Sequence, residues 1–231
     1  AWVVCDRQDA DRYRRLLQEG KPIESRLAAD LDAHLNAEIA LGTVETLGEA
    51  MDWLETTFYF VRAQSDSGGA YASGDALRES VRETVDDLVR QGFASLDGDA
   101  IAATPLGRLA SKFYLRLDTA RRFADVAERE DVDDGVILEA VAGAAEFDSV
   151  SARSDEEDAV RAVLGERAAH LDPGPRKVLA ILRAGMSGTT PGALQSDAWV
   201  IRQNARRLLA ALLAICDRFA GARAANRVKR V

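Results

Sequence analysis

The sequence predicts a mainly α-helical chain in which a winged-helix domain is followed by an all-helical domain. Two observations predict this fold class. Apolar residues recur at three- and four-residue spacing along most of the 231 residues, which is the pattern of amphipathic helices. Within residues 93–103, two short apolar runs flank Asp97-Gly98-Asp99, as in a β-hairpin. Helices followed by one small hairpin are typical of a winged helix. We therefore expect that domain at 21–117 and a helical domain at 118–231, after a leading segment at 1–20.

The leading segment is expected to hold one strand and one helix. The apolar run from Trp2 to Cys5 predicts a short buried strand. Asp9 to Glu19 shows helical spacing, and Gly20-Lys21-Pro22 ends that helix. Its inward face is predicted to carry Tyr13, Leu16 and Leu17.

Three helices are expected in the winged-helix domain before the hairpin. The first covers 23–41 and is ended by Gly42, and Thr43 or Thr46 caps the second. A polar, Gly-rich loop at 65–74 leads to the third helix at 75–91. The predicted apolar faces are Leu27, Leu31, Leu35 and Ile39 in the first helix, Ala50, Trp53, Leu54, Phe58 and Val61 in the second, and Leu77, Val81, Val85 and Leu88 in the third.

A capped helix follows the hairpin and leads into the helical domain. Thr104 suits the N-cap and Pro105 the first helical position. Ser196 or Asp197 is expected to cap the last and longest helix. The further helices are predicted at 118–130, 133–146, 154–170, 174–186 and 196–219, with a loop or extended piece at 147–150. The buried stripe of the last helix is predicted to be Ile201, Ala205, Leu208, Leu212, Ile215 and Phe219.

Composition excludes several classes of protein. No run of about 18 apolar residues occurs, so no membrane span is expected. Cys5 and Cys216 are far apart in the sequence, which favours a reducing, cytoplasmic compartment over a disulfide framework. With two histidines and no Cys/His cluster, no zinc site is expected. The first residue is Ala1 rather than Met, which favours a fragment of a longer chain.

Charge is distributed unevenly along the chain. The formal net charge is −8, and residues 1–120 account for it with 13 basic and 21 acidic side chains. Residues 196–231 carry 8 basic and 2 acidic side chains, a net of +6. The basic residues of a nucleic-acid-binding surface are therefore expected at the C-terminal end.

The acidic surface has two explanations that the sequence leaves open. Asp outnumbers Glu by 23 to 15, and only 4 of the 30 basic residues are lysines. A halophilic organism would favour such an Asp-rich, Lys-poor surface for solubility. A GC-rich genome would favour the same residues through its codons.

The N-terminal half of the last helix is the strongest candidate for binding nucleic acid. Trp199, Arg202, Gln203, Arg206 and Arg207 combine an aromatic ring with guanidinium and amide groups. Rings stack on bases and arginines hold phosphates, so this set suits a single strand. The alternative is an ordinary amphipathic helix with solvated arginines and a core Trp.

Two segments resemble the Ski-like branch of superfamily-two DExH-box helicases, of the archaeal DNA-repair type. They are P-I-E-S-R-L…L-N-A-E-I-A-L-G-T-V…W-L-E-T-T-F-Y-F-V-R, from Pro22 to Arg62, and T-P-L-G-R-L-A-S-K-F-Y, from Thr104 to Tyr114. The resemblance covers roughly residues 10–225, and it departs at Ser65 to Tyr71, where many relatives carry Asn-Pro-x-Tyr-Tyr. It implies that 1–20 is a remnant of the second motor lobe. It also implies that the winged helix braces the motor and that the helical domain closes a ring around the translocating strand.

The resemblance also implies roles for single residues. D-A-W-V-I-R-Q-N-A-R-R-L-L-A-A-L, starting at Asp197, is similar to the ratchet helix that runs beside the strand in these helicases. By helical phase it turns Val200, Gln203 and Arg207 towards the strand. This face differs in part from the face of Trp199, Arg202 and Arg206, and Arg207 stands where relatives often carry an aromatic residue.

Three further features have a structural interpretation beside a functional one. Arg108, in the first turn of the capped helix, could hold a phosphate, while Gly107 and Ser111 let a neighbouring helix approach. Phe147 to Glu157 resembles the family segment E-F-x-x-V-x-x-R-x-x-E and is expected to be a linker with Ser154 as N-cap, Arg153 being a possible exception. His34 and Glu38 are expected to dock the domain on the motor rather than to bind a metal.

The motor itself is missing from the sequence. There is neither a G-x-x-x-x-G-K-[ST] loop nor a DExH box, so the chain should not hydrolyse ATP alone. It is expected to bind no cofactor, since ATP and Mg²⁺ belong to the parent motor. The expected partners of this monomer are single-stranded or forked DNA, with RNA as the alternative, and the motor lobes of the same polypeptide. DNA is favoured because the sequence ends where archaeal relatives enter a helix-hairpin-helix module. The competing hypothesis is a stand-alone winged-helix regulator that binds duplex, or a docking module without catalytic activity.

Overall fold

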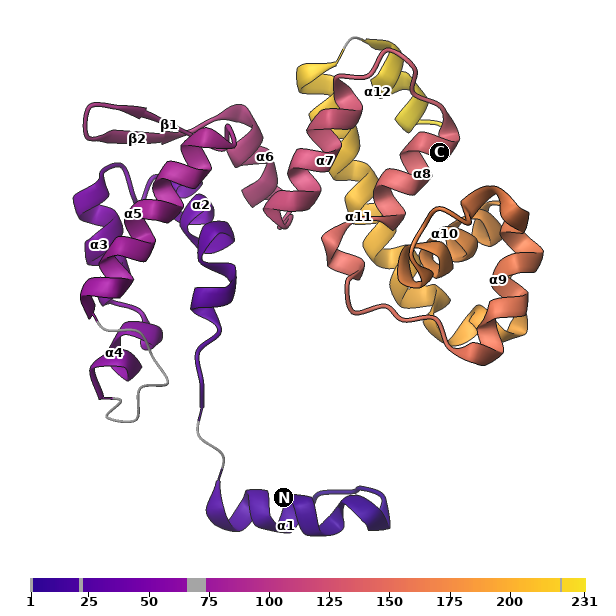
Figure 1. The fold of residues 1–231 in the computed structure, drawn as a ribbon, viewed down its shortest axis with the longest axis horizontal. Helices are drawn as coiled ribbons and strands as arrows, with labels where there is room; N and C mark the ends of the chain where they lie inside the picture. The colour runs from indigo at the N-terminus through magenta and orange to yellow at the C-terminus, as the bar shows by residue number, and fades with distance from the viewer. Residues whose placement is uncertain (1, 21–22, 66–73, 221) are drawn as a thin grey trace.

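The computed structural model describes residues 2–20, 23–65, 74–220 and 222–231. Over these residues the predicted fold class is confirmed, with helices throughout and one two-stranded antiparallel sheet. A winged-helix domain precedes an all-helical domain, and the two meet through α6 and α7 (Figure 1). The expected Gly-rich loop at 65–74 lies almost wholly outside the described residues.

The winged-helix domain is built on three packed helices. α2 (Leu31–Leu41) follows a 3-10 turn at Leu27–Asp30 and packs against α5 (Gly74–Arg90) and α6 (Pro105–Lys112). α3 (Leu47–Glu55) and α4 (Phe58–Ser65) cover α5. All four predicted apolar residues of α5 are buried, and Thr46 caps α3 in a reciprocal capping box with Glu49.

The wing is the hairpin of β1 (Ala94–Asp97) and β2 (Ala100–Ala103), as predicted. Ala94 pairs with Ala103 and Asp97 with Ala100, so Gly98-Asp99 forms the two-residue loop. Gly98 has a φ of 63°, a left-handed conformation that glycine adopts without steric cost.

The contact between α2 and α6 requires a glycine. A Cβ on Gly107 would lie 2.1 Å from the Phe93 carbonyl oxygen and 2.8 Å from Asn36 Oδ1. The buried Asn36 side chain donates a hydrogen bond to the Gly107 carbonyl at 3.0 Å. Thr104 accepts a hydrogen bond from the Gly107 N–H, so the predicted N-cap is confirmed as well.

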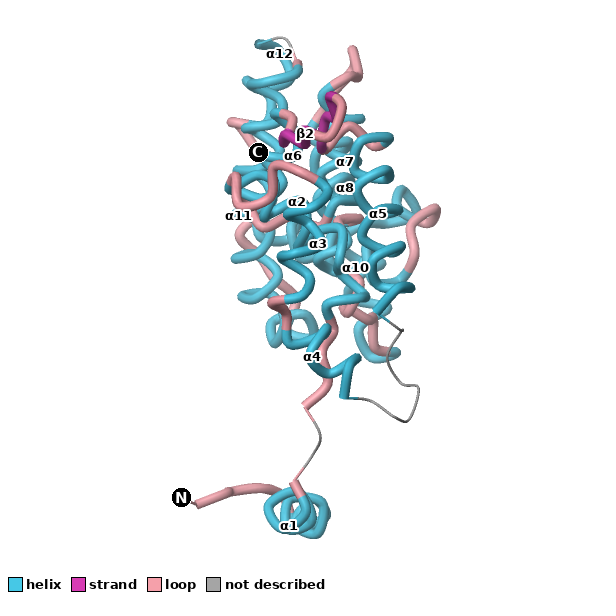
Figure 2. Tube along the Cα trace, turned by 90° about the vertical axis from the view of Figure 1, so that its left-hand side faces the viewer, coloured by secondary structure: helices cyan, strands magenta, loops and turns pink. Residues whose placement is uncertain are grey.

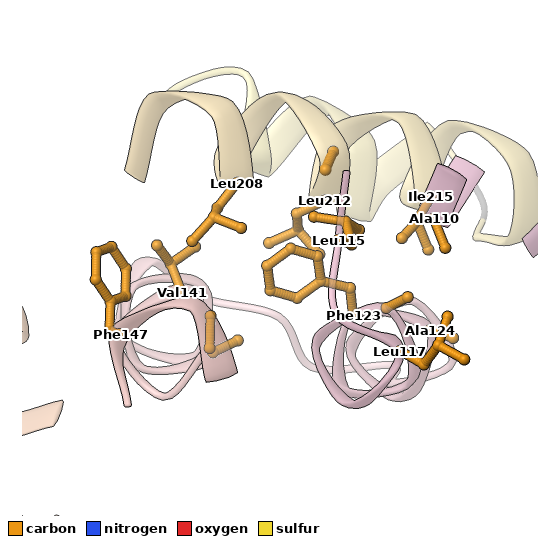
Figure 3. Close-up of a cluster of buried hydrophobic side chains, with 14 of the residues drawn as sticks. Ala110, Leu115, Leu117, Phe123, Ala124, Val141, Phe147, Leu208, Leu212 and Ile215 are labelled. Atoms are coloured by element: carbon orange, nitrogen blue, oxygen red, sulfur yellow. The ribbon is translucent and has the colours of Figure 1, made fainter. Parts of the chain in front are cut away.

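The helical domain packs around α11 (Gln195–Phe219), against which α7 (Leu117–Ala127), α8 (Asp134–Ala142) and α10 (Pro173–Met186) lie. Figure 3 shows Phe123 beneath Leu212, and Phe147 and Val141 facing Leu208. α9 (Glu157–Leu164) covers α10, and α12 (Ala222–Val228), which the sequence did not predict, packs on α11. Short 3-10 turns lie at Ala145–Phe147, Ser154–Glu156, Gly165–Ala168 and Gly192–Leu194.

The leading segment corrects two predictions. Residues 2–5 form no strand, and Trp2 is 97% exposed, because no other described segment pairs with this backbone. The predicted helix is present as α1 (Ala10–Glu19), after a 3-10 turn at Arg7–Asp9, but it stands apart from the rest of the chain (Figure 2). The predicted inward residues Leu16 and Leu17 are therefore exposed.

The second predicted helix is in fact two helices. Thr56 and Thr57 turn their hydroxyls onto the Trp53 and Leu54 carbonyls, which ends α3 before α4 begins. The break changes the helical phase, so Tyr59 and Phe60 are buried. Phe58 and Val61, which were predicted to be buried, are exposed.

Several helix ends in the winged-helix domain and in the helical domain also differ from the prediction. Residues 23–26 are not helical, and α8 ends at Ala142 rather than at residue 146. α11 begins at Gln195 directly from the preceding 3-10 turn, without a side-chain cap from Ser196 or Asp197. Its predicted stripe is buried except for Phe219, which is exposed at the C-terminal end.

Candidate nucleic-acid interface

An open groove runs along the N-terminal half of α11. The segment Gly188–Thr190 forms one wall, and α11 supplies Trp199, Arg202, Gln203 and Arg206. The Trp199 side chain is 70% exposed, and Gln203 and Arg206 are exposed beside it. Because these positions follow one another at three- and four-residue spacing, they share one face of the helix. An indole, an amide and a guanidinium are thus presented together to solvent.

Arg202 lies deeper in the groove than its neighbours. Its guanidinium donates a hydrogen bond to the Thr190 hydroxyl, and a Cβ on Gly185 would lie 2.9 Å from its Nε atom. The side chain is half-buried between α10, the 188–190 segment and α11. Arg202 therefore joins the two walls of the groove.

The second predicted face, Val200, Gln203 and Arg207, is brought together only in part. Val200 is 54% exposed and Gln203 is exposed. Arg207 is half-buried, and its Nη1 atom donates to the carbonyl oxygens of Phe113 at 2.6 Å and Tyr114 at 2.9 Å. Arg207 thus binds the backbone at the end of α6, and it does not line the groove.

Arg108 lies away from the groove. It is exposed on the first turn of α6 and lines a separate shallow hollow with Leu109, Ala214, Asp217 and Arg218. Apart from Val200, the predicted site residues therefore fall into three places: the groove, the backbone of residues 113–114, and the hollow between α6 and the C-terminal half of α11.

A buried ionic cluster that the sequence did not predict fixes the start of α11. Lys177, on α10, is 1% exposed, and its ammonium donates to Glu156 Oε2 at 2.8 Å, Asp197 Oδ2 at 2.5 Å and the Ser151 carbonyl at 3.1 Å. All three ammonium protons are used. Asp197 thus serves this contact, where a helix cap was predicted. It precedes Trp199 by two residues, so the cluster holds the first turn of α11 against α10.

The segment that was expected to be a simple linker supplies half of this cluster. Ser154 does not cap the following helix; Glu156 Oε2 instead accepts a hydrogen bond from the Arg153 N–H at 2.7 Å. The Arg153 guanidinium lies 2.5 Å from Glu156 Oε1 and 3.8 Å from Asp197 Oδ2. A useful sequence signal was Lys177 itself, a rare lysine before the apolar run 178–182.

The cluster keeps both carboxylates charged. Burial alone would raise the pKa of Glu156, but hydrogen bonds from Lys177 and the Arg153 backbone, with the charges of both residues, outweigh it and lower that pKa. The Lys177 hydrogen bond lowers the pKa of Asp197 more than burial raises it. The positive charges of Lys177 and Arg153 therefore offset the negative charges of Glu156 and Asp197 in this cluster.

Other candidate chemistry is not assembled in the described residues. They contain no group of three or more His, Cys, Asp and Glu side chains placed to hold a metal ion. His34 is exposed, and Glu38 accepts a hydrogen bond from the Thr43 hydroxyl beside it. Within the same residues, no helix is long and apolar enough to cross a bilayer.

Known proteins match the chain over both domains. The model of the Sec63 Brl domain matches residues 103–230, and that of a winged helix-turn-helix domain matches residues 24–103. Activating signal cointegrator 1 complex subunit 3 of Mus musculus is 30% identical over 94% of this chain. The RQC trigger complex helicase SLH1 of Saccharomyces cerevisiae is 29% identical over 92% of it, and the DExH-box ATP-dependent RNA helicase DExH12 of Arabidopsis thaliana is 29% identical over 91%.

The chain spans only 10–12% of the length of these relatives. Two of the three are named as helicases, and the resemblance to Ski-like DExH-box helicases is confirmed at that level. The Sec63 Brl match covers 128 of the 231 residues (103 to 230), which is more than half. The chain therefore belongs to the Sec63 Brl domain family, with a winged helix-turn-helix domain in front.

Proposed function

We propose that this chain is the accessory portion of an ATP-dependent nucleic-acid helicase, where it braces the motor and grips the translocating single strand. The groove of α11 is the observation that carries the proposal. Trp199, Gln203 and Arg206 stand exposed on one helix face, and the 188–190 segment gives the groove a second wall. The relatives named as helicases support the helicase setting.

The groove chemistry suits a strand of any sequence. The Trp199 ring offers a stacking surface to any base, because every base has a π-face. Arg206 offers a guanidinium to a phosphate, and the Gln203 amide can donate and accept hydrogen bonds at a base edge. None of these contacts requires a particular base, as translocation along a strand demands.

The competing regulator is less well supported by the geometry of α5. A duplex-binding winged helix needs a basic recognition helix. On α5, Arg78 pairs with Glu55 and Asp75, Arg82 with Glu79, and Arg90 with Asp87. These arginines share their surface with carboxylates, and a duplex phosphate backbone would be repelled there.

We also propose DNA repair in a salt-adapted archaeon as the setting, and DNA as the strand. The Asp-rich, Lys-poor composition supports the salt adaptation. RNA is the alternative, since one relative is named an RNA helicase. The binding experiment therefore compares both strands.

The test is fluorescence anisotropy of this chain with a labelled oligodeoxythymidylate, the matching oligouridylate and a DNA duplex, over a range of salt. We expect tighter binding to a single strand than to duplex. Trp199→Ala and Arg206→Ala should each weaken it, and Arg206→Ala should also reduce the salt dependence because it removes a phosphate contact.

Arg161→Ala is the matched control, since Arg161 is an exposed arginine on α9 whose charge pairs with Asp158. It should leave binding unchanged. Equal losses in Arg161→Ala and Arg206→Ala would mean general charge attraction rather than a groove. A preference for duplex would favour the regulator, and no binding at low salt would favour a docking module.

A further inference from the structure

Tyr114 is an exposed aromatic residue at the junction of the two domains. It lies between α6 and α7, and it is 86% exposed. Its φ of 52° is the one positive value among the described residues that does not belong to a glycine. The ring is therefore held outside the core by a backbone conformation that tyrosine rarely adopts.

This conformation is unfavourable for a residue with a Cβ. Glycine is the usual choice where a helix ends in the left-handed region, because it has no side chain to clash with the backbone. The Tyr114 ring gains little from burial in return. Residues kept in such conformations are concentrated at functional sites, where the surrounding structure holds them in place.

Hydrogen bonds from the Tyr114 N–H to the Ser111 carbonyl at 3.1 Å and from the Leu115 N–H to the Ala110 carbonyl at 2.9 Å close the turn at the end of α6. Arg207 then ties this turn to α11. Its Nη1 atom donates to the Phe113 and Tyr114 carbonyl oxygens at 2.6 and 2.9 Å. Through these bonds the Tyr114 backbone is tied to α11, one residue beyond Arg206 at the end of the groove. Further along α11, Arg218 and Arg108 line the hollow between α11 and α6. Tyr114 is thus attached to α11 between these two arginine-bearing places.

We propose that Tyr114 is a base-stacking contact for the single strand, next to the groove along α11. The proposal rests on the strand-gripping function proposed above and adds a binding residue to it. An exposed ring stacks on any base, and the next contact along the strand is then Arg108 with Arg218. Arg207 is a positioning residue here, because it fixes the Phe113–Tyr114 backbone instead of touching the strand.

The test compares Tyr114→Gly and Tyr114→Phe with the unmodified chain, by anisotropy with a labelled oligothymidylate. Glycine suits a φ of 52° and removes the ring, so the melting temperature should not fall while the affinity drops about fivefold or more. Phenylalanine keeps the ring and should keep the affinity. Neither variant removes a charge, so the slope of affinity against salt should stay the same.

Two further measurements locate the contact. An oligonucleotide that carries 5-iodouracil should crosslink to Tyr114 on irradiation, with the adduct mapped by mass spectrometry. Arg207→Ala should weaken binding in the unmodified chain but add little in the Tyr114→Gly background, because the two residues act through one contact. Additive losses would mean that Arg207 acts independently of Tyr114 and would overturn its positioning role.

The outcomes separate this proposal from the one on which it rests. If Trp199→Ala and Arg206→Ala weaken binding while Tyr114→Gly binds as the unmodified chain does, the stacking role is overturned and the groove stands. Tyr114 would then be free to serve a protein partner. If the unmodified chain binds no single strand, both proposals fail. Loss of affinity in Tyr114→Gly with retention in Tyr114→Phe supports the stacking contact.

Discussion

The Lys177 ammonium lies 2.8 Å from Glu156 Oε2, and both side chains are fully buried. This ion pair joins α10 to the segment before α9, and Asp197 extends it to the first turn of α11. The position of the groove residues therefore depends on a charge cluster behind them. Breaking a buried pair on one side is costly, because the remaining charge stays in the interior without a partner.

Lys177→Met should destabilise the chain by about 3–5 kcal/mol, since it leaves the buried Glu156 carboxylate without its ammonium. Urea unfolding followed by circular dichroism measures this difference. The control is Lys229→Met, which removes an exposed lysine that lies 3.8 Å from Asp217. It should change stability by about 1 kcal/mol or less. Similar losses in both variants would contradict the assigned role of the cluster.

The same cluster should make the free energy of unfolding decrease as the pH is lowered. The folded-state pKa values of Glu156 and Asp197 lie below the ordinary values of these carboxyl groups, because both accept hydrogen bonds from Lys177. Their contribution is therefore fully present above about pH 5, where the carboxylates are ionised in both states, and is lost as the pH falls through the folded pKa values. Urea unfolding from neutral pH down to pH 3 measures it. Glu156→Gln should flatten this pH dependence, and an unchanged slope in that variant would exclude Glu156 as a source.

Gly107→Ala should destabilise the winged-helix domain, because its Cβ would lie 2.1 Å from the Phe93 carbonyl. Moving α6 away from the Phe93 backbone and from Asn36 on α2 is expected to cost about 1–3 kcal/mol or more, as in other overpacked cores. Thermal unfolding measures the change. Gly48→Ala is the matched control, since the nearest atom to its Cβ is 3.8 Å away. That helical position should gain up to about 1 kcal/mol from alanine.

The two cysteines should differ sharply in reactivity. Burial, together with the nearby Asp217 charge, raises the pKa of Cys216 to about 11, whereas Cys5 is exposed. Since the thiolate is the reactive form, iodoacetamide should label Cys5 at neutral pH and spare Cys216 until the chain unfolds. In a Cys5→Ser variant, labelling followed by mass spectrometry should then report the opening of α11. Fast labelling of that variant in native buffer would show that α11 is not packed as described.

The spacing of apolar residues was enough to predict burial in helices that bury a single face. The four predicted apolar residues of α5 are buried, and so is the predicted stripe of α11 from Ile201 to Ile215. Thr104 caps α6, as predicted. Local chemistry also explains the hairpin, because Asp97-Gly98-Asp99 allows a tight turn with a positive φ. These features depend on neighbours within a few residues. The domain boundary after residue 117, in contrast, stays a prediction.

Other features depended on contacts that periodicity does not record. Trp2 and Leu17 have the apolar character of core residues, yet no described element covers them. That residues of α11 bind a nucleic-acid strand also stays a prediction. The structure shows, however, that these residues have different surroundings. Arg202 and Arg207 have the same side chain on the same helix, and one joins the groove walls while the other binds the Phe113 and Tyr114 carbonyls.

The sequence by itself determined the hairpin, the cap of α6 and the apolar faces of α5 and α11, because hydrophobic spacing and capping residues act over short stretches of chain. The family resemblance was also visible in the sequence, in the segments Pro22 to Arg62 and Thr104 to Tyr114. Only the tertiary structure decided that Lys177 meets Glu156 and Asp197, and that Arg207 binds the Tyr114 carbonyl. Those contacts join residues 20 to 93 positions apart, and their geometry exists only once the helices have packed.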